Sequence, residues 1–202
     1  SSDVCSSDLL DHPILFVIDQ LSNDFGVDLR YDYTGDLAGH RSKFTFGFAP
    51  TWGIVEDNRY ANVLGRRGAK FADSHQTSTN LDLYAQEQFW LTEKFALSLG
   101  AQVSYAERKN RDDFPTGPDN SDTQSWWGFS PKFGALYQIT KDTQIFANVS
   151  RSFEPPSFGE LTDAANNGRG LVKLDAQTGT TIEIGTRGRS GRIAWDLAYY
   201  YS

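Results

Sequence analysis

Two adjacent arginines, Arg66 and Arg67, are the first residues in this sequence whose chemistry suggests ligand contact. A guanidinium group keeps its charge, and its planar fork binds carboxylates through paired hydrogen bonds. The pair therefore predicts contact with an anionic ligand. The alternative, which we favour on residue type, is a loop that is solvated or faces lipopolysaccharide.

Two adjacent tryptophans, Trp126 and Trp127, are the second candidates. Their rings could stack on a bound ligand. Membrane β-barrels also gather aromatic side chains in girdles at both membrane interfaces. Because a strand begins near these residues, the girdle is the favoured interpretation.

Metal binding and catalysis find little support. Four acidic residues in one segment do not match the spacing of a calcium loop: Asp112, Asp113, Asp119 and Asp122. The three histidines, His12, His40 and His75, lie in separate connections and lack the spacing of zinc ligands. Asp82 and Glu87 fall on opposite faces of one expected strand. No nucleophile elbow and no phosphate loop is present. The sequence predicts no enzyme, no metal site and no cofactor.

The overall charge and the cysteine content exclude further classes of protein. The formal net charge is −7, which argues against nucleic acid as a partner. Cys5 is the single cysteine, so no disulfide within the chain is expected.

The elements that position these residues are expected to be long β-strands. From Phe95 to Ala106, apolar side chains alternate with small or polar ones without interruption. Strands in soluble proteins are usually about five or six residues long, whereas a tilted strand crossing a bilayer needs about nine to eleven. Seven other segments are expected to be strands: 25–33, 44–48, 81–90, 129–139, 143–153, 180–187 and 193–201. Glu87 conflicts with this pattern, because it falls on the apolar face of its strand.

The connections between these strands alternate between short turns and long polar segments. The long ones are Trp52–Asn80, Glu107–Gln124 and Glu154–Gly179. Outer-membrane barrels have short turns on one side of the membrane and long loops on the other. The mean hydropathy is −0.49, and no apolar run approaches the length of about 18 residues that a spanning helix needs. The sequence therefore predicts an all-β fold, an antiparallel transmembrane β-barrel portion. A soluble antiparallel sheet is the alternative.

The ends of the chain suggest a fragment. The sequence contains no methionine and stops inside a strand-like run. Residues 1–10 differ from the rest and are interpreted as an expression or sequencing scar. We expect residues 11–202 to form one partial barrel.

The run from Ser150 to Leu161, SRSFEPPSFGEL, resembles TonB-dependent outer-membrane receptors, in which a strand passes into a loop with two prolines followed by Glu-Leu. The segments 65–68, 84–87, 129–132 and 182–185 are also similar to that family, in the same order. The resemblance extends from about residue 11 to the end. It is greatest to receptors of the ferric citrate and siderophore type.

This resemblance implies a barrel of about 22 strands that encloses a plug. The plug and the TonB-contacting segment are expected upstream of this chain. About eight strands cannot close such a barrel, so the chain should form an open sheet. The implied function is TonB-energised uptake of an iron complex, captured by long loops at the bacterial outer membrane. The implied partners are an iron–siderophore or similar small ligand, the TonB complex through the plug, and outer-membrane lipid and lipopolysaccharide. The alternatives are a passive porin, a receptor for a non-iron substrate, an outer-membrane enzyme and a soluble β module.

Overall fold

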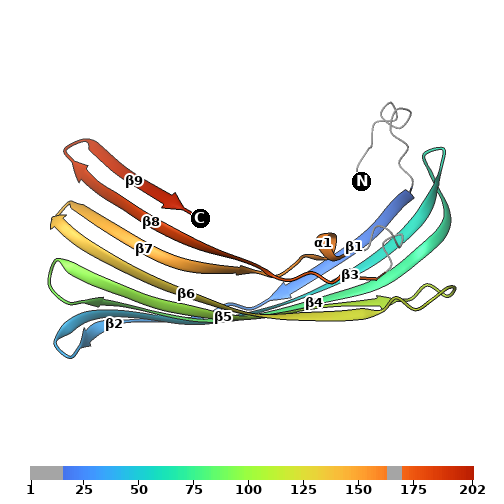
Figure 1. Ribbon diagram of the computed structural model, residues 1–202, viewed down its shortest axis with the longest axis horizontal. Helices are drawn as coiled ribbons and strands as arrows, with labels where there is room; N and C mark the ends of the chain where they lie inside the picture. The colour runs from blue at the N-terminus through green and yellow to red at the C-terminus, as the bar shows by residue number, and fades with distance from the viewer. Residues whose placement is uncertain (1–15, 163–169) are drawn as a thin grey trace.

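The computed structural model describes residues 16–162 and 170–202, and in these residues nine strands form one antiparallel sheet. The sheet is curved into an open trough, with the short helix α1 on its concave side (Figure 1). The elements are β1 (Phe16–Gly26), β2 (Leu29–Leu37), β3 (His40–Val63), β4 (Arg66–Trp90), β5 (Phe95–Asp112), β6 (Asp122–Thr140), β7 (Thr143–Glu154), α1 (Phe158–Leu161), β8 (Gln177–Ser190) and β9 (Ile193–Tyr201). No helix in the described residues is long and apolar enough to cross a membrane.

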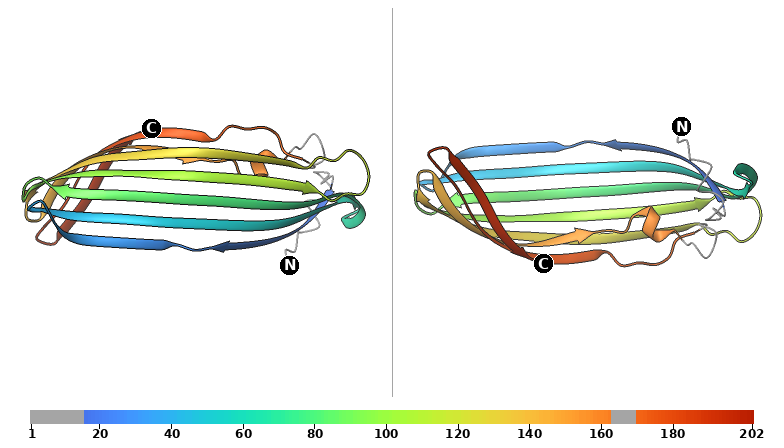
Figure 2. Two further views of the ribbon diagram at one scale, coloured as in Figure 1. Left: turned by 90° about the horizontal axis from the view of Figure 1, so that it is seen from below. Right: turned by 90° about the horizontal axis from the view of Figure 1, so that it is seen from above.

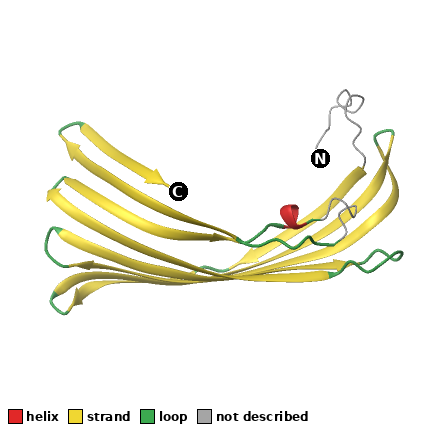
Figure 3. Ribbon diagram, viewed as in Figure 1, coloured by secondary structure: helices red, strands yellow, loops and turns green. Residues whose placement is uncertain are grey.

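The strands pair in chain order from β3 to β9 and run side by side along the sheet (Figure 2). The β2–β3, β4–β5, β6–β7 and β8–β9 turns lie at one end of the sheet, which we call the short-turn end (Figure 3). The β3–β4 turn and the β5–β6 and β7–β8 connections lie toward the other end, the long-strand end. The open, all-β antiparallel sheet predicted from the sequence is confirmed.

The first expected strand, 25–33, is divided in two. Both β1 and β2 pair with β3, and pairing is interrupted at Val27 and Asp28. Pro50 of β3 lies at this break, where its carbonyl accepts a hydrogen bond from the Val27 N–H at 3.1 Å. The N–H and C=O of a strand residue point to the same side, so proline removes the donor that would continue the pairing. The eight expected strands thus become nine elements.

The segment Trp52–Asn80 is a hairpin, and the expectation of a long loop there is wrong. β3 runs to Val63 and β4 starts at Arg66, with Leu64 and Gly65 turning at φ values of 52° and 80°. The positive φ suits glycine. The segment Glu107–Gln124 is strand at both ends and a loop only in its middle, since β5 continues to Asp112 and β6 begins at Asp122. These stretches extend beyond the apolar band, where neither face needs apolar side chains.

An apolar band with aromatic borders covers the convex face. On β5 it runs from Phe95 to Tyr105 and on β6 from Trp127 to Tyr137, each span being eleven residues. At the border nearer the long-strand end, Tyr105 packs against Trp127 with ring centres 4.8 Å apart. Phe25 stacks on Trp52 with ring centres 5.9 Å apart. The eleven-residue span of the band matches the length of strand that crosses a bilayer, about nine to eleven residues. Many large apolar side chains of the band are exposed, as expected for a surface that faces lipid.

Glu87 does lie on the convex face, close to the short-turn end. The Ser42 hydroxyl donates to Glu87 Oε1 at 2.7 Å, and Ser42 is almost fully buried. A charge near the membrane interface costs much less than one at the bilayer centre. The hydrogen bond and this position together explain how the carboxylate is tolerated.

Candidate ligand-binding site

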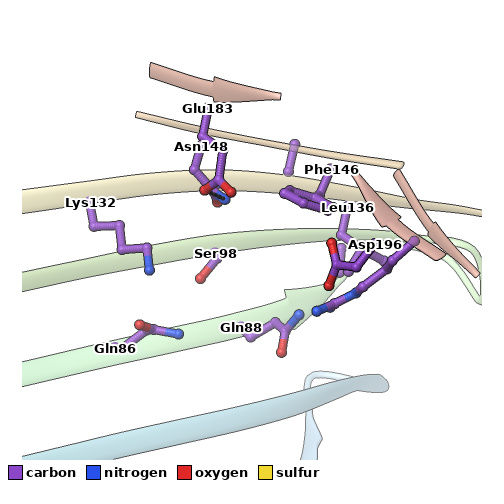
Figure 4. Close-up of a pocket in the computed structure, with 13 residues that line it drawn as sticks. Gln86, Gln88, Ser98, Lys132, Leu136, Phe146, Asn148, Glu183 and Asp196 are labelled. Atoms are coloured by element: carbon purple, nitrogen blue, oxygen red, sulfur yellow. Dashed lines mark hydrogen bonds between the residues drawn. The ribbon is translucent and has the colours of Figure 1, made fainter. Parts of the chain in front are cut away.

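Every second residue of each strand points to the concave face, which could therefore form a binding surface. In the short-turn half, side chains from β4 to β9 line a cavity of about 330 Å³ (Figure 4). Asn148 of β7 and Glu183 of β8 point toward one another, and the Asn148 amide donates to Glu183 Oε2 at 3.1 Å. Lys132 of β6 extends over the same surface. This wall can bind polar groups, but it brings no nucleophile next to a base.

A larger cavity, about 530 Å³, lies at the long-strand end between α1 and the strands β1, β3 and β4. Its lining is mainly aromatic and aliphatic, with one charged pair and two glutamine side chains: Phe16, Ile18, Gln20, Asp57, Arg59, Ala61, Phe71, Gln76, Phe158, Gly159 and Thr162. Cavities of about 300–1,000 Å³ with apolar walls and few polar groups are typical of small-molecule sites. This cavity is our candidate ligand-binding site.

The charged pair in this cavity is Asp57 and Arg59 of β3. Arg59 Nη2 lies 2.9 Å from Asp57 Oδ2, and the two side chains are 12% and 5% exposed. The Arg59 guanidinium also lies 5.7 Å from the centre of the Phe16 ring. The site therefore presents a largely desolvated ion pair beside apolar walls, a combination suited to a ligand with both polar and hydrophobic parts.

Helix α1 forms the inner wall of the cavity and is fixed by a capping box. The Ser157 hydroxyl accepts from the Glu160 N–H, and the Glu160 carboxylate accepts from the Ser157 N–H at 2.8 Å. The pKa of Glu160 is held below its usual value, mainly by the hydrogen bond from the Ser157 backbone and secondly by the one from the Ser157 side chain. Leu161 is fully buried, so the helix is attached by packing as well as by its cap.

The β7–β8 connection supplies α1 and has two described arms, residues 155–162 and 170–176. The arms pair with each other through a bridge between Thr162 and Leu171 and a 2.7 Å hydrogen bond from the Val172 N–H to the Leu161 carbonyl. The second arm also contacts β6, because Trp126 Nε1 donates to the Leu174 carbonyl at 2.9 Å. A loop folded over the concave face thus completes the cavity wall.

The four residues predicted to bind ligand do not line this cavity. Arg66 is exposed beside the β3–β4 turn, and Arg67 pairs with Asp19 at 2.9 Å and lies 4.5 Å from the Tyr60 ring centre. Trp127 is 72% exposed on the convex face, where the girdle interpretation puts it. Trp126 points to the concave face and binds the backbone of the loop. Their contact with ligand stays a prediction.

The acidic residues of the β5–β6 segment and His40 have structural contacts. Asp112 accepts hydrogen bonds from the backbone and side chain of Asn120, which closes the β5–β6 loop. Hydrogen bonds from Ser121 keep the pKa of Asp119 low. His40 Nδ1 contacts the Trp90 carbonyl at 3.0 Å. In residues 16–162 and 170–202 there is no cluster of three potential metal ligands. His12, Cys5 and residues 1–10 lie outside the described residues.

Sequence reasoning missed Asp57, Arg59 and Phe158 as site residues. Asp57 and Arg59 are two residues apart and therefore share a strand face. That signal was hidden because their segment was interpreted as a loop. Phe158 lies in a proline-containing connection without strand alternation, and its position opposite β1 depends on the fold of the loop.

Curated proteins similar to this chain include receptors for metal complexes. The chain is 31% identical over 115 residues to the metal-pseudopaline receptor CntO of Pseudomonas aeruginosa strain UCBPP-PA14. The match covers 52% of this chain and 16% of the relative, so the chain spans a small part of such a receptor.

Solved receptors share the fold at low sequence identity. The unliganded ferric citrate transporter FecA superposes with a TM-score of 0.74 at 15% identity, covering 92% of this chain and 28% of that one. The copper transporter OprC gives 0.72 at 15% identity, with coverages of 93% and 30%. The siderophore receptor PiuA from Acinetobacter baumannii gives 0.70 at 15% identity, with coverages of 91% and 32%.

A sequence profile described as "TonB dependent receptor-like, beta-barrel" matches residues 7–202, nearly the whole chain. Barrels of this family are outer-membrane proteins and act as receptors rather than enzymes, as the sequence predicts. The chain belongs to the TonB-dependent receptor β-barrel family.

Proposed function

We propose that this chain is part of the barrel wall of a receptor that takes up an iron complex, such as a ferric siderophore or ferric citrate, with energy from the TonB complex. The observation that carries the proposal is the cavity between α1 and strands β1, β3 and β4, within a barrel of the TonB-dependent family. Short turns face the periplasm in outer-membrane barrels. The cavity is at the opposite end of the strands, on the side from which a ligand arrives.

The lining of the cavity supports a ligand that is both acidic and partly apolar. Iron complexes of this kind carry carboxylate, catecholate or hydroxamate oxygens on an organic frame. Gln20 and the Arg59 guanidinium, which Asp57 shares, can donate hydrogen bonds to ligand oxygens, and Phe16, Phe71 and Phe158 can pack against the frame. No covalent step is needed, because the role of the site is capture.

A complex of a metal other than iron is the second candidate. Two observations favour it: the 31% identical relative is a metal-pseudopaline receptor, and one solved structure of the same fold is a copper transporter.

The test is uptake by cells that carry the full-length gene or its deletion. Cells are supplied in turn with radioactive iron as ferric citrate, as a ferric catecholate and as a ferric hydroxamate, and with radioactive nickel, zinc or copper bound to a carboxylate chelator. The proposal predicts receptor-dependent accumulation of at least one iron complex. Accumulation of only a non-iron metal would favour the second candidate, and no receptor-dependent accumulation would refute both.

A further inference from the structure

Trp126 and Trp127 are neighbours in the sequence but have opposite environments. Trp127 points to the convex face and packs on Tyr105, whereas Trp126 points to the concave face. Gln124, two residues before Trp126, shares the concave face. Its amide nitrogen donates to the Val172 carbonyl at 3.0 Å.

Gln124 and Trp126 make side-chain hydrogen bonds where β6 has no backbone pairing with β7. Backbone pairing between β6 and β7 ends at Lys132 and Ser150, so residues 122–131 of β6 do not pair with β7. Gln124 and Trp126 instead bind carbonyls that are also two residues apart, those of Val172 and Leu174. The matched spacing holds the second arm of the β7–β8 connection along β6.

The second arm in turn holds the first. Val172 donates its N–H to the Leu161 carbonyl, and Leu171 pairs with Thr162. Leu161 is the last residue of α1 and is fully buried. A continuous series of contacts therefore runs from β6 through both arms to α1, which contributes Phe158 and Gly159 to the cavity.

We propose that Gln124 and Trp126 are positioning residues, which fix α1 as a wall of the ligand cavity by holding residues 172–174 against β6. Trp126 acts through the arm and has no contact of its own with the cavity. The proposal concerns the placement of the wall, so its test needs no ligand and can fail independently of the proposed uptake.

The experiment uses the full-length receptor in detergent, with Cys5→Ser to remove the native thiol of this chain. Two rates are measured: tryptic cleavage after Lys173, which lies between the two held carbonyls, and labelling of a Leu161→Cys thiol by a maleimide. Both report how often the wall opens. Trp126→Phe removes the indole donor and keeps an aromatic ring, and Gln124→Met removes the amide donor and keeps the length of the side chain.

Each variant should raise both rates about fivefold, because one hydrogen bond contributes about 1 kcal/mol and slow cleavage follows the population of the open form. The double variant should raise them further. Trp127→Phe is the matched control and should change neither rate. Cleavage after Lys141, in the β6–β7 turn, and the heat-induced shift of the barrel band on gels should be the same in all variants.

Three results would overturn the proposal. Unchanged rates in both donor variants would mean that the hydrogen bonds do not hold the arm. An equal increase in Trp127→Phe would indicate general loosening. Faster cleavage after Lys173 without faster labelling at position 161 would mean that the arm does not position α1. If Trp126→Phe fails to form a barrel, Gln124→Met alone decides between these outcomes.

Discussion

Asp57 and Arg59 form an ion pair with only 5% and 12% of their side chains exposed, in the wall of the candidate ligand cavity. Burial removes most of the hydration of both groups, so each depends on the other. Arg30 and Asp32 form a pair of the same spacing on β2, but their side chains are 56% and 43% exposed. The two pairs differ mainly in burial, which makes one the natural control for the other.

We predict that Asp57→Asn destabilises the barrel by about 3 kcal/mol, because it removes the carboxylate that neutralises the Arg59 guanidinium in a desolvated site. Asp57→Asn combined with Arg59→Gln should cost less than Asp57→Asn alone. Asp32→Asn should have no measurable effect. The measurement is the concentration of guanidinium chloride at which half of the receptor, reconstituted in liposomes, is unfolded. Equal shifts for Asp57→Asn and Asp32→Asn would contradict this account of the pair.

The bond between Ser42 and Glu87 gives a second prediction. Ser42→Ala should destabilise the barrel by about 1–2 kcal/mol, because a carboxylate on the convex face loses its donor. Glu87→Gln should be neutral or stabilising, since it removes a charge from the lipid-facing surface. Ser98→Ala on the concave face is the control. The prediction is wrong if Ser42→Ala and Ser98→Ala unfold at the same denaturant concentration.

The capping box of α1 gives a prediction on pH. The pKa of Glu160 is lowered in the folded protein, so its stabilising effect is complete above the usual glutamate value of 4.5 and is lost as the pH falls below it. Amide exchange of residues 158–162, corrected for the intrinsic rate, should therefore accelerate at acid pH. Glu160→Gln should remove this dependence, and a variant with an unchanged pH profile would exclude the cap as its cause.

Gly128 is expected to tolerate no larger residue. A Cβ there would lie 2.2 Å from the Phe153 ring, at the base of the side chain, so the ring would have to move. We predict that Gly128→Ala lowers the yield of heat-shifted barrel, because it displaces Phe153 at the point where β6 and β7 separate. Gly159→Ala is the control, since its Cβ would meet nothing closer than 3.8 Å. Equal yields would show that the Phe153 ring adapts freely.

The lipid-facing part of the fold could be predicted from the sequence because lipid demands a strict alternation. The alternation predicts a strand that begins at Phe95, where β5 does begin. The strand ranges leave short turns at 91–94 and 140–142, and the strands turn at 91–94 and 141–142. Where the strands extend beyond the membrane, neither face has to carry apolar side chains. Residues 54–80 therefore have a polar composition typical of a loop, although they continue β3 and β4.

The candidate site could be predicted only in part. Arg66 and Arg67 were selected because they are adjacent and charged, but adjacent residues in a strand point to opposite faces. Arg59 is an isolated arginine in the sequence, and its importance depends on burial, on Asp57 and on the ring of Phe16. Contacts between β3 and α1, about 100 residues apart in the sequence, have no local signal.

Energised uptake through a receptor of this family is the central claim, and loss of the energy source tests it most directly. Cells carrying the full-length gene are given the radioactive metal complex that they accumulate, with TonB present or deleted. We predict that receptor-dependent accumulation falls to the level of the receptor deletion when TonB is absent, while binding at the cell surface is retained. Accumulation that continues without TonB would contradict the account and would indicate a passive channel.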